Sequence, residues 1–320
     1  MLTPRNLRPA RSIIDLIGNT PVVELTQVVE EPSARLFAKL ESLNPGGSVK
    51  DRLGIGMIRA AEKAGLLQPG ATIVEPTAGN TGIALALAGV RLGYKVILVV
   101  PENFSIEKQQ LMRALGGTLI LTSRDDGMKG AIARAEEIAR TTPGAYLPQQ
   151  FRNPSNSAVH YETTGPELFA QLEGRVDAFV CGSGTGGTFT GVSRYLKERS
   201  RAIHCVIVEP QGSVLQGGTA GPHEVEGIGA SFIPEALDMT LADEFITVTD
   251  TPAFAMVSRL AAEEGILSGS SGGAAVHAAV EVARRLGPEK VVATIIPDSA
   301  ERYLSKGIFS NWADADPNDG

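Results

Sequence analysis

The sequence predicts an α/β protein of two domains, each an open, mostly parallel sheet flanked by helices. Its 320 residues exceed what one hydrophobic core usually supports, so two domains are expected. Short runs of Val, Ile and Leu, without alternating polar residues, are separated by stretches in which apolar residues recur at helical spacing. Strands of this kind are buried on both faces, which is typical of a parallel sheet.

The predicted elements form two successive sets. The first set has strands at 20–25, 35–40, 72–76, 95–100 and 118–122, and helices that begin near Lys50 and at 80–92, 105–115 and 127–140. The second set has strands at 177–181, 204–210 and 290–297, and helices at 189–199, 252–264 and 273–286. Two sheets in one chain leave a cleft between them, and this cleft is the expected ligand site.

The stretch 44–52, NPGGSVKDR, places Lys50 directly after a glycine turn and at the start of a helix that Ser48 can cap. Exposed amide groups at a helix start oppose a positive charge, so we expect the pKa of Lys50 to be lowered. A lysine that loses its proton is a nucleophile, and it usually reacts with a carbonyl. The alternative is a solvated lysine that pairs with Asp51 at the surface.

The loop 182–188, GSGTGGT, follows one predicted strand and opens a helix. Its glycines allow backbone amide groups to approach an anion, and Thr185 and Thr188 add hydroxyl donors. Hydroxyl groups at a helix start suit a single phosphate dianion. The sequence therefore predicts a phosphate site at this loop.

A dinucleotide site is the alternative for the same loop. Gly182, Gly184 and Gly187 satisfy the pattern GxGxxG, and Glu209 ends the next strand, 22 positions after Gly187 (209 − 187 = 22). This pattern alone supports a nicotinamide-dependent dehydrogenase. However, dinucleotide folds usually begin with such a loop, whereas this one follows a complete α/β unit.

A second loop at a helix start, TAGNT, follows the strand 72–76. Such a loop is suited to a carboxylate, although it could be a simple capping turn. Asn80 could also donate a hydrogen bond to a phenolate-like oxygen. The candidates for the carboxylate site are Thr77, Gly79, Thr81 and, from the later PQQF stretch, Gln150.

Two further segments are candidates for the site. In 269–275, GSSGGAA, Ser271 could bind a ring nitrogen or cap the following helix. The stretch 217–229 has almost no apolar residues and predicts a mobile loop over a site.

Composition excludes several classes of protein. With 36 acidic and 29 basic residues the net charge is −7, which argues against nucleic acid or an anionic membrane as a partner. Cys181 and Cys205 lie in apolar runs and are interpreted as buried thiols in a reducing compartment. The four histidines lack metal-ligand spacing, so no metal site is expected. No apolar stretch long enough for a signal peptide or membrane span follows the arginines near the N-terminus, so the expected location is the cytoplasm.

An activated lysine, a phosphate loop and a carboxylate loop together indicate pyridoxal phosphate acting on an amino acid. The motifs NPGGSVKDR, EPTAGNTGIALA, GSGTGGT, EGIGA and PDSAERYLS resemble the cysteine synthase and cystathionine β-synthase group of pyridoxal-phosphate enzymes, from Ile17 to Ile308. This resemblance implies the fold type II architecture, similar to the tryptophan synthase β chain. It also implies a larger cofactor-binding domain, 1–43 and 151–320, and a smaller mobile substrate-carboxylate domain, 44–150.

The resemblance implies a role for each matching residue. Lys50 would hold the cofactor as a Schiff base and act as the catalytic base. The phosphate would be bound by Gly184, Thr185, Gly186, Gly187 and Thr188, the ring oxygen by Asn80 and the ring nitrogen by Ser271. The substrate carboxylate would be bound by Thr77, Gly79, Thr81 and Gln150, with Gly227 near the amino group.

The implied reaction is β-replacement on O-acetylserine or another activated serine. Sulfide is the expected nucleophile, and the segment 160–168 resembles cysteine synthases. Homocysteine is the alternative, because the segments 104–109 and 220–229 resemble bacterial enzymes that make cystathionine. A homodimer is expected, and a serine acetyltransferase is a possible partner. A member of the group that binds an amino acid or a partner without catalysis is a further alternative.

Overall fold

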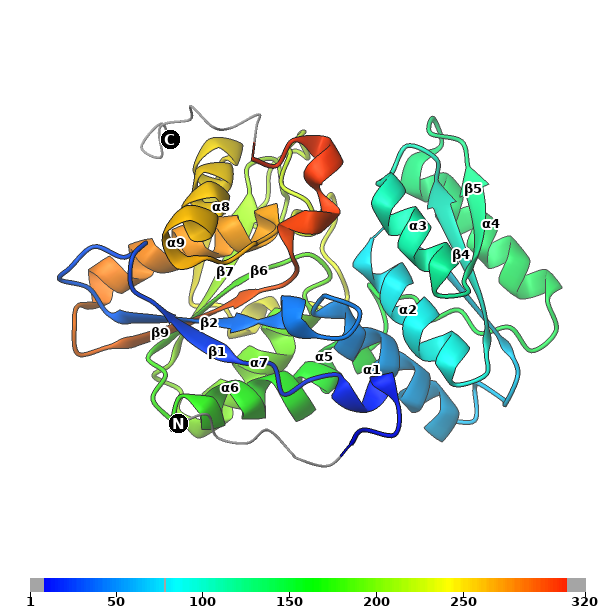
Figure 1. Cartoon of the computed structure of the whole chain (residues 1–320), viewed down its shortest axis with the longest axis horizontal. Coiled ribbons are helices and arrows are strands. Elements are labelled where there is room, and N and C mark those ends of the chain that lie inside the picture. Colours follow the sequence, from blue (N-terminus) through cyan, green and yellow to red (C-terminus); the bar gives the residue numbers. More distant parts are fainter. Residues whose placement is uncertain (1–8, 78, 310–320) are drawn as a thin grey trace.

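The computed structural model describes residues 9–77 and 79–309. Ala78, which belongs to the predicted carboxylate loop, lies outside this range. Two sheets are flanked by helices on both faces (Figure 1). The strands are β1 (Val22–Leu25), β2 (Arg35–Leu40), β3 (Thr72–Pro76), β4 (Lys95–Pro101), β5 (Thr118–Thr122), β6 (Ala178–Gly182), β7 (His204–Pro210), β8 (Glu244–Val248) and β9 (Val291–Ile296).

The helices lie between and after these strands. They are α1 (Lys50–Lys63), α2 (Asn80–Arg91), α3 (Ile106–Ala114), α4 (Gly127–Thr141), α5 (Ser155–Val159), a π-helical turn (His160–Thr164), α6 (Gly165–Gln171), α7 (Gly187–Arg199), α8 (Asp250–Glu264) and α9 (Ser270–Leu286). Short 3-10 turns occur at Ile13–Leu16, Glu41–Leu43, Met239–Leu241, Ala300–Arg302 and Leu304–Lys306.

The larger sheet has the order β1-β2-β9-β6-β7-β8 and the smaller one β3-β4-β5. All paired strands are parallel except β1, which runs antiparallel to β2. The prediction of mostly parallel sheets is therefore confirmed. Strand β9 lies between β2 and β6, so the larger sheet is complete only when the C-terminal part of the chain returns to its centre.

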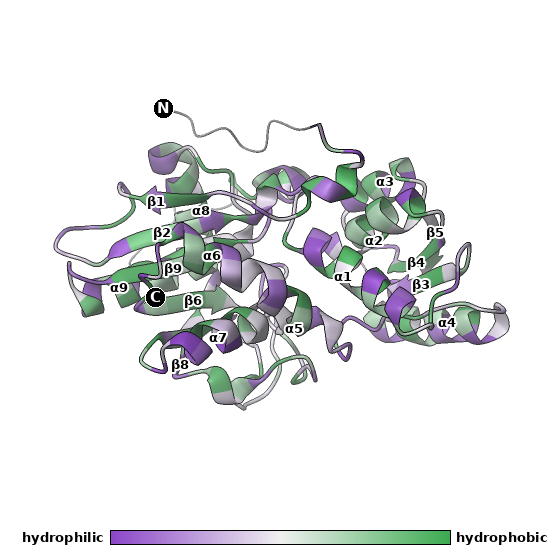
Figure 2. Cartoon of the chain, turned by 90° about the horizontal axis from the view of Figure 1, so that it is seen from below, coloured by the Kyte–Doolittle hydropathy of each residue, from purple (hydrophilic) through white to green (hydrophobic). Residues whose placement is uncertain are grey.

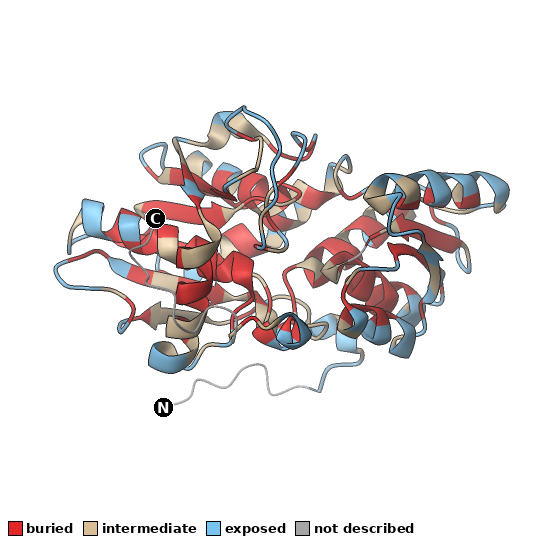
Figure 3. Cartoon of the chain, turned by 90° about the horizontal axis from the view of Figure 1, so that it is seen from above, coloured by how far each residue is buried: buried red, intermediate tan, exposed pale blue. Residues whose placement is uncertain are grey.

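Each sheet is the middle layer of a three-layer structure. Ala178 and Val180 of β6 pack in one core with α8 and α9, whereas the alternate residues Phe179 and Cys181 pack in another core with α6 and α7. In the smaller sheet Leu98 packs with α1 and α2, and its neighbour Val99 with α4. The strands are accordingly hydrophobic along most of their length (Figure 2), and the backbone coloured as buried runs through the middle of each half of the molecule (Figure 3). Strands β3, β4, β6, β7 and β9 are mostly buried, whereas β1, β5 and β8 are partly exposed. Successive side chains of a strand point to opposite faces of the sheet. Because both faces are covered, both sets of side chains are apolar, and the sequence of the strand is a continuous apolar run.

Two regions differ from the prediction. Strand β8 was missed because it is an edge strand that pairs only with β7 among the described strands, and its residues alternate between buried and exposed instead of forming an apolar run. The helical stretch from Ser155 to Gln171 was missed because a π-helical turn divides it into short pieces with many polar residues. Helices α7 and α9 also begin two or three residues earlier than predicted, within their glycine-rich starts.

The loop 217–229 contains more buried apolar surface than the sequence indicated. Val225 and Ile228 are 2% and 5% exposed and belong to the core beneath α8 and α9. The expectation that this loop has almost nothing to bury is therefore wrong, and its mobility stays a prediction. Among the described residues no helix combines the length and apolar character needed to span a bilayer.

Candidate active site

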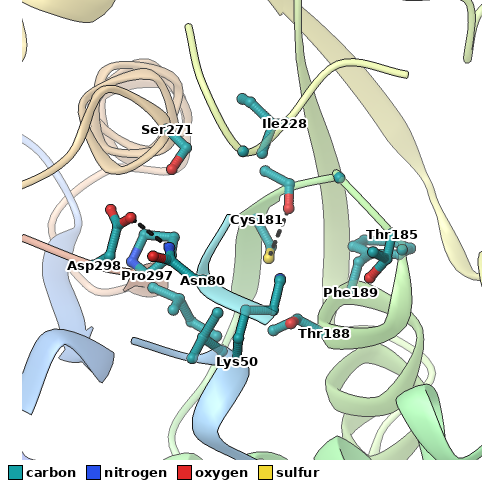
Figure 4. A pocket seen from close by; sticks show the side chains of 16 residues that line it. Lys50, Asn80, Cys181, Thr185, Thr188, Phe189, Ile228, Ser271, Pro297 and Asp298 are labelled. Carbon is teal, nitrogen blue, oxygen red and sulfur yellow. Dashed lines mark hydrogen bonds between the residues drawn. The ribbon is translucent and has the colours of Figure 1, made fainter. Parts of the chain in front are cut away.

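A pocket lies at the carboxyl end of β6, where the first turns of α1, α2, α7 and α9 meet (Figure 4). The pocket brings together eight residues that the sequence predicted: Lys50, Asn80, Gly184, Thr185, Gly186, Thr188, Gly227 and Ser271. These residues come from both halves of the chain. Convergence of helix starts and strand ends at one cleft is the usual place for a ligand in open α/β folds.

Lys50 is the first residue of α1, and its N–H donates to Ser48 Oγ at 3.2 Å. The preceding residue is fixed to the larger sheet, since Val49 N–H donates to Pro297 O at 2.8 Å. Burial lowers the pKa of Lys50, and the nearby Asp298 carboxylate partly opposes this effect. The predicted direction is confirmed, but its main cause is burial rather than the field of the helix. The amine can therefore act as a nucleophile and as a base.

Asp51 is fully buried and accepts a hydrogen bond from the N–H of Gly46. The alternative of an exposed pair between Lys50 and Asp51 is thus wrong. Burial raises the pKa of Asp51 to about 7, so this carboxyl group stays protonated to a higher pH than a solvated one does.

We expect Asp51→Asn to reduce the loss of stability between about pH 5 and about pH 8. The folded pKa of Asp51 is about 7, above the ordinary value of 3.8, so its contribution is complete at low pH and is lost as pH rises through about 7. The amide resembles the protonated acid and cannot ionise. Between about pH 5 and about pH 8, the free energy of unfolding measured in urea should fall by about 2 kcal/mol less in the variant than in the wild type. Equal losses in both proteins would show that Asp51 does not titrate there.

The phosphate loop is held tightly by its surroundings. It connects the end of β6 to the start of α7, and a Cβ added at Gly184 would lie 2.2 Å from the carbonyl oxygen of Gly227. A Cβ at Gly187 would lie 1.9 Å from Asn156 Oδ1, and Gly186 has a φ of 83°. These positions therefore require glycine for packing and backbone conformation, in addition to any approach of a ligand.

Two buried side chains that the sequence did not single out hold the threonine hydroxyl groups of this loop. Asn156 Nδ2 donates to Thr185 Oγ1 at 2.9 Å, and His160 Nε2 lies 3.1 Å from Thr188 Oγ1. Burial lowers the pKa of His160 well below its usual value, so the imidazole is neutral. Its other nitrogen, Nδ1, lies 2.8 Å from Thr164 Oγ1. Both hydroxyl groups are thus preorganised at the start of α7.

Asn80 and Ser271 occupy the first turns of α2 and α9. Asn80 Nδ2 donates to Asp298 Oδ2 at 2.7 Å, and Arg302 donates to Asn80 Oδ1. Ser271 is 3% exposed and faces the pocket beside Gly227. Asp298 is a pocket residue to which no role was assigned from the sequence, although it is the second residue of the motif PDSAERYLS.

The predicted carboxylate residues form a neighbouring cluster instead of lining this pocket. Thr81 Oγ1 donates to Gln150 Oε1 at 2.6 Å, and Gly79 N–H lies 3.4 Å from Thr77 Oγ1. Buried Glu75 accepts from the N–H of Gln150 at 3.1 Å, which fixes the backbone there. The cluster lies at the start of α2, adjacent to Asn80.

The donors in the pocket fit pyridoxal phosphate. Lys50 supplies an amine for a carbonyl, the start of α7 with Thr185 and Thr188 supplies hydrogen-bond donors for a phosphate, and the Ser271 hydroxyl can meet a ring nitrogen. Cys181 also lines the pocket, but burial raises the pKa of its thiol to about 12. This thiol is therefore neutral and is not a candidate nucleophile.

The dinucleotide alternative does not fit the structure. Glu209 is buried, and its two carboxylate oxygens accept from Leu215 N–H at 3.1 Å and from Gln216 Nε2 at 2.8 Å. The carboxylate is thus occupied by its own loop and does not present itself to a ribose.

Residues 13–298 match the family described as pyridoxal-phosphate dependent enzyme, and the chain belongs to this family. It is an enzyme that depends on pyridoxal phosphate. The chain is 48% identical over 305 residues to "Cysteine synthase" of Staphylococcus aureus, which covers 95% of this chain and 98% of that relative. It is 51% identical over 298 residues to "Cysteine synthase" of Helicobacter pylori, covering 92% and 97% of the two chains. The resemblance to the cysteine synthase and cystathionine β-synthase group is confirmed.

Solved structures give the same fold. The O-acetylserine dependent cystathionine β-synthase of Helicobacter pylori has a TM-score of 0.89 and 50% identity, and covers 95% of this chain and 100% of its own. The cysteine synthase of Entamoeba histolytica has a TM-score of 0.92 and 38% identity, with 97% and 93% covered. The fold type II architecture is thereby confirmed.

Proposed function

We propose that this enzyme makes L-cysteine from O-acetylserine and sulfide. The observation that carries the proposal is the 48% identity to a cysteine synthase over nearly the whole of both chains. The pocket around Lys50 supports it, because its donors suit the cofactor that this replacement needs. In the reaction the bond from the β-carbon to the acetate oxygen breaks, and a bond to sulfur forms. The α-proton leaves first and returns at the end.

We assign the proton transfers to Lys50. Its Nζ takes the α-proton and later returns it, as its lowered pKa permits. Bound pyridoxal phosphate supplies the electron sink that makes the α-proton acidic. Thr185, Thr188 and the backbone of Gly184, Gly186 and Gly187 would hold the phosphate, and Ser271 would contact the ring nitrogen. A neutral serine does not force that nitrogen to carry a proton, which favours prompt loss of the β-substituent.

The second cluster is assigned to the substrate carboxylate. Thr77, Gly79, Thr81 and Gln150 surround the start of α2, where backbone N–H groups and the helix dipole favour an anion. Gly227 is assigned to the substrate amino group. The segment 44–150 is proposed to be the smaller, mobile domain, and 1–43 with 151–320 the larger one. Closure of 44–150 on the bound carboxylate would exclude water during the reaction.

Homocysteine is the second candidate nucleophile. The observation in its favour is the 50% identity to an O-acetylserine dependent cystathionine β-synthase whose whole chain is matched. Sulfide and homocysteine differ only in the group that carries the attacking sulfur, so both fit the same Lys50 chemistry.

The test supplies the purified holoenzyme with O-acetylserine and each nucleophile in turn. We expect cysteine to form with a kcat/KM for sulfide at least about tenfold above that for homocysteine, which corresponds to about 1.4 kcal/mol between the transition states. A large preference for homocysteine would reassign the enzyme as a cystathionine synthase. No change in the cofactor spectrum on addition of O-acetylserine would instead indicate a non-catalytic binding protein.

The assembly and location are also proposals. A homodimer is expected, with a serine acetyltransferase as a possible partner, in the cytoplasm. Light scattering on the purified protein measures its molar mass, and a molar mass of one chain would exclude the homodimer.

A further inference from the structure

Asn80 is held by two partners of opposite chemical character, both from the C-terminal segment that is red in Figure 1. Its Nδ2 donates to Asp298 Oδ2 at 2.7 Å (Figure 4), and its Oδ1 accepts from Arg302. A guanidinium group can only donate, and an ionised carboxylate can only accept. The two contacts therefore determine which end of the amide points in which direction.

A flipped amide would be unfavourable in this environment. It would place N–H donors against the Arg302 guanidinium and an oxygen against the Asp298 carboxylate, so two hydrogen bonds to buried side chains would be lost. The amide nitrogen has two hydrogens, and Asp298 takes one of them. Since Asn80 lines the pocket, the second N–H is left for an acceptor inside it.

Both partners of Asn80 are themselves fixed. Tyr303 OH donates to the same Asp298 oxygen, and Arg302 also donates to the carbonyl oxygen of Gly46. Asp298 and Arg302 are 2% and 8% exposed, so these contacts are shielded from water. The amide orientation is thus determined by a connected set of buried groups.

We infer that Asp298 and Arg302 are positioning residues that hold the Asn80 amide so that an N–H, and never its oxygen, faces the ring oxygen of the cofactor. This inference rests on the proposed function, because it requires pyridoxal phosphate in the pocket. An N–H donor stabilises the ionised form of a phenolic oxygen. Loss of the orientation should therefore change the protonation of the ring oxygen as well as the affinity for the cofactor.

The test is a double-mutant cycle with Arg302→Met and Asn80→Ala, read out as the dissociation constant of pyridoxal phosphate. Arg302→Met keeps a long apolar stem but has no donor. In the wild-type background it should weaken cofactor binding about tenfold, as expected for loss of a hydrogen bond to a charged group. In the Asn80→Ala background the same change should weaken binding by less than about twofold, because Arg302 acts through Asn80.

A second readout is the absorbance of the bound cofactor at constant pH. Arg302→Met should shift absorbance from the visible band of the ionised ring oxygen to the near-ultraviolet band, and Arg302→Lys, which keeps a donor, should largely restore the visible band. Glu301→Gln is the matched control, since Glu301 is the exposed neighbour of Arg302 and should leave both readouts unchanged. If Arg302→Met does not fold, Tyr303→Phe removes only the hydroxyl group that holds Asp298 and should produce the same shift to a smaller extent.

Equal losses in both backgrounds, or an unchanged spectrum in Arg302→Met and in Tyr303→Phe, would overturn the inference. Failure of the proposed function would look different. In that case the wild-type protein itself would bind no pyridoxal phosphate or would form no cysteine.

Discussion

Lys50→Ala is expected to lower turnover by about 10⁴-fold or more, with the fold intact. General-base catalysis alone contributes up to about 10⁴-fold, and the covalent attachment of the cofactor is lost as well. Stability should change little, because a lysine with a lowered pKa in a pocket contributes no ion pair to the core. Steady-state turnover of O-acetylserine with sulfide, beside a thermal melt of the same sample, measures both effects.

Lys63→Ala is the matched control for this experiment. Lys63 is exposed in the last turn of the same helix, α1, and its removal should leave activity and melting temperature unchanged. Substantial activity in Lys50→Ala after removal of contaminating wild-type protein would refute the assignment of Lys50 as the base.

Arg52→Met is expected to lower the free energy of unfolding by about 3–5 kcal/mol. Arg52 is 1% exposed and lies two residues after Lys50 on α1. Its Nε contacts Glu41 Oε2 at 2.8 Å, and its Nη2 contacts Glu167 Oε2 at 2.7 Å. In the variant, Lys39 Nζ would remain 2.9 Å from Glu167 Oε2, and Glu41 would keep hydrogen bonds from Thr20 and Asn44 but would lose its cationic partner. Removing one partner of a buried ion cluster is costly because the remaining charge stays desolvated.

Urea unfolding of Arg52→Met and of a control, Arg59→Met, tests this expectation. Arg59 lies on the same helix and pairs with Glu62 at 2.8 Å, but its side chain is 56% exposed. Such a surface pair contributes at most about 1 kcal/mol, so the control should unfold nearly as the wild type does. If both variants lost the same small amount, the buried cluster would not be a principal support of α1.

The ion cluster of Arg52, Glu41, Glu167 and Lys39 also predicts how the stability of the protein changes in acid. Although burial raises the pKa of Glu167, its hydrogen bonds from Arg52 and the charge of Arg52 outweigh this and lower the pKa to about 2. A folded pKa below the ordinary value of 4.5 gives stability that is present above that value and is lost as pH falls toward about 2. We expect this acid-side loss to be smaller in Arg52→Met.

The sequence predicted the parts of the site that have local signals. Lys50 follows a glycine turn, and the phosphate loop has a strand before it and a helix after it, so a short stretch of chain contains the whole pattern. The parallel strands other than β8 were predicted for the same reason, because each of their apolar runs is contiguous. Strand β8 has no such run, since as an edge strand it alternates buried and exposed residues.

The groups that hold the site could not be found in this way. Asn156 and His160 reach the phosphate loop from the irregular helical stretch before β6, and Asp298 and Arg302 reach Asn80 from more than two hundred residues away (298 − 80 = 218). Only the tertiary fold brings these residues together. The burial of Asp51, which excludes the alternative of a surface pair with Lys50, likewise depends on packing that no local pattern shows.

The Lys50 amine, in a pocket between the two sheets, is assigned to carry the cofactor. The most direct test of this assignment is borohydride reduction of the holoenzyme, which fixes pyridoxal phosphate on the lysine that holds it, followed by peptide mass spectrometry. We predict a single modified peptide with the label on Lys50. A label on another lysine, or no label on a protein that still makes cysteine, would refute the assignment of Lys50.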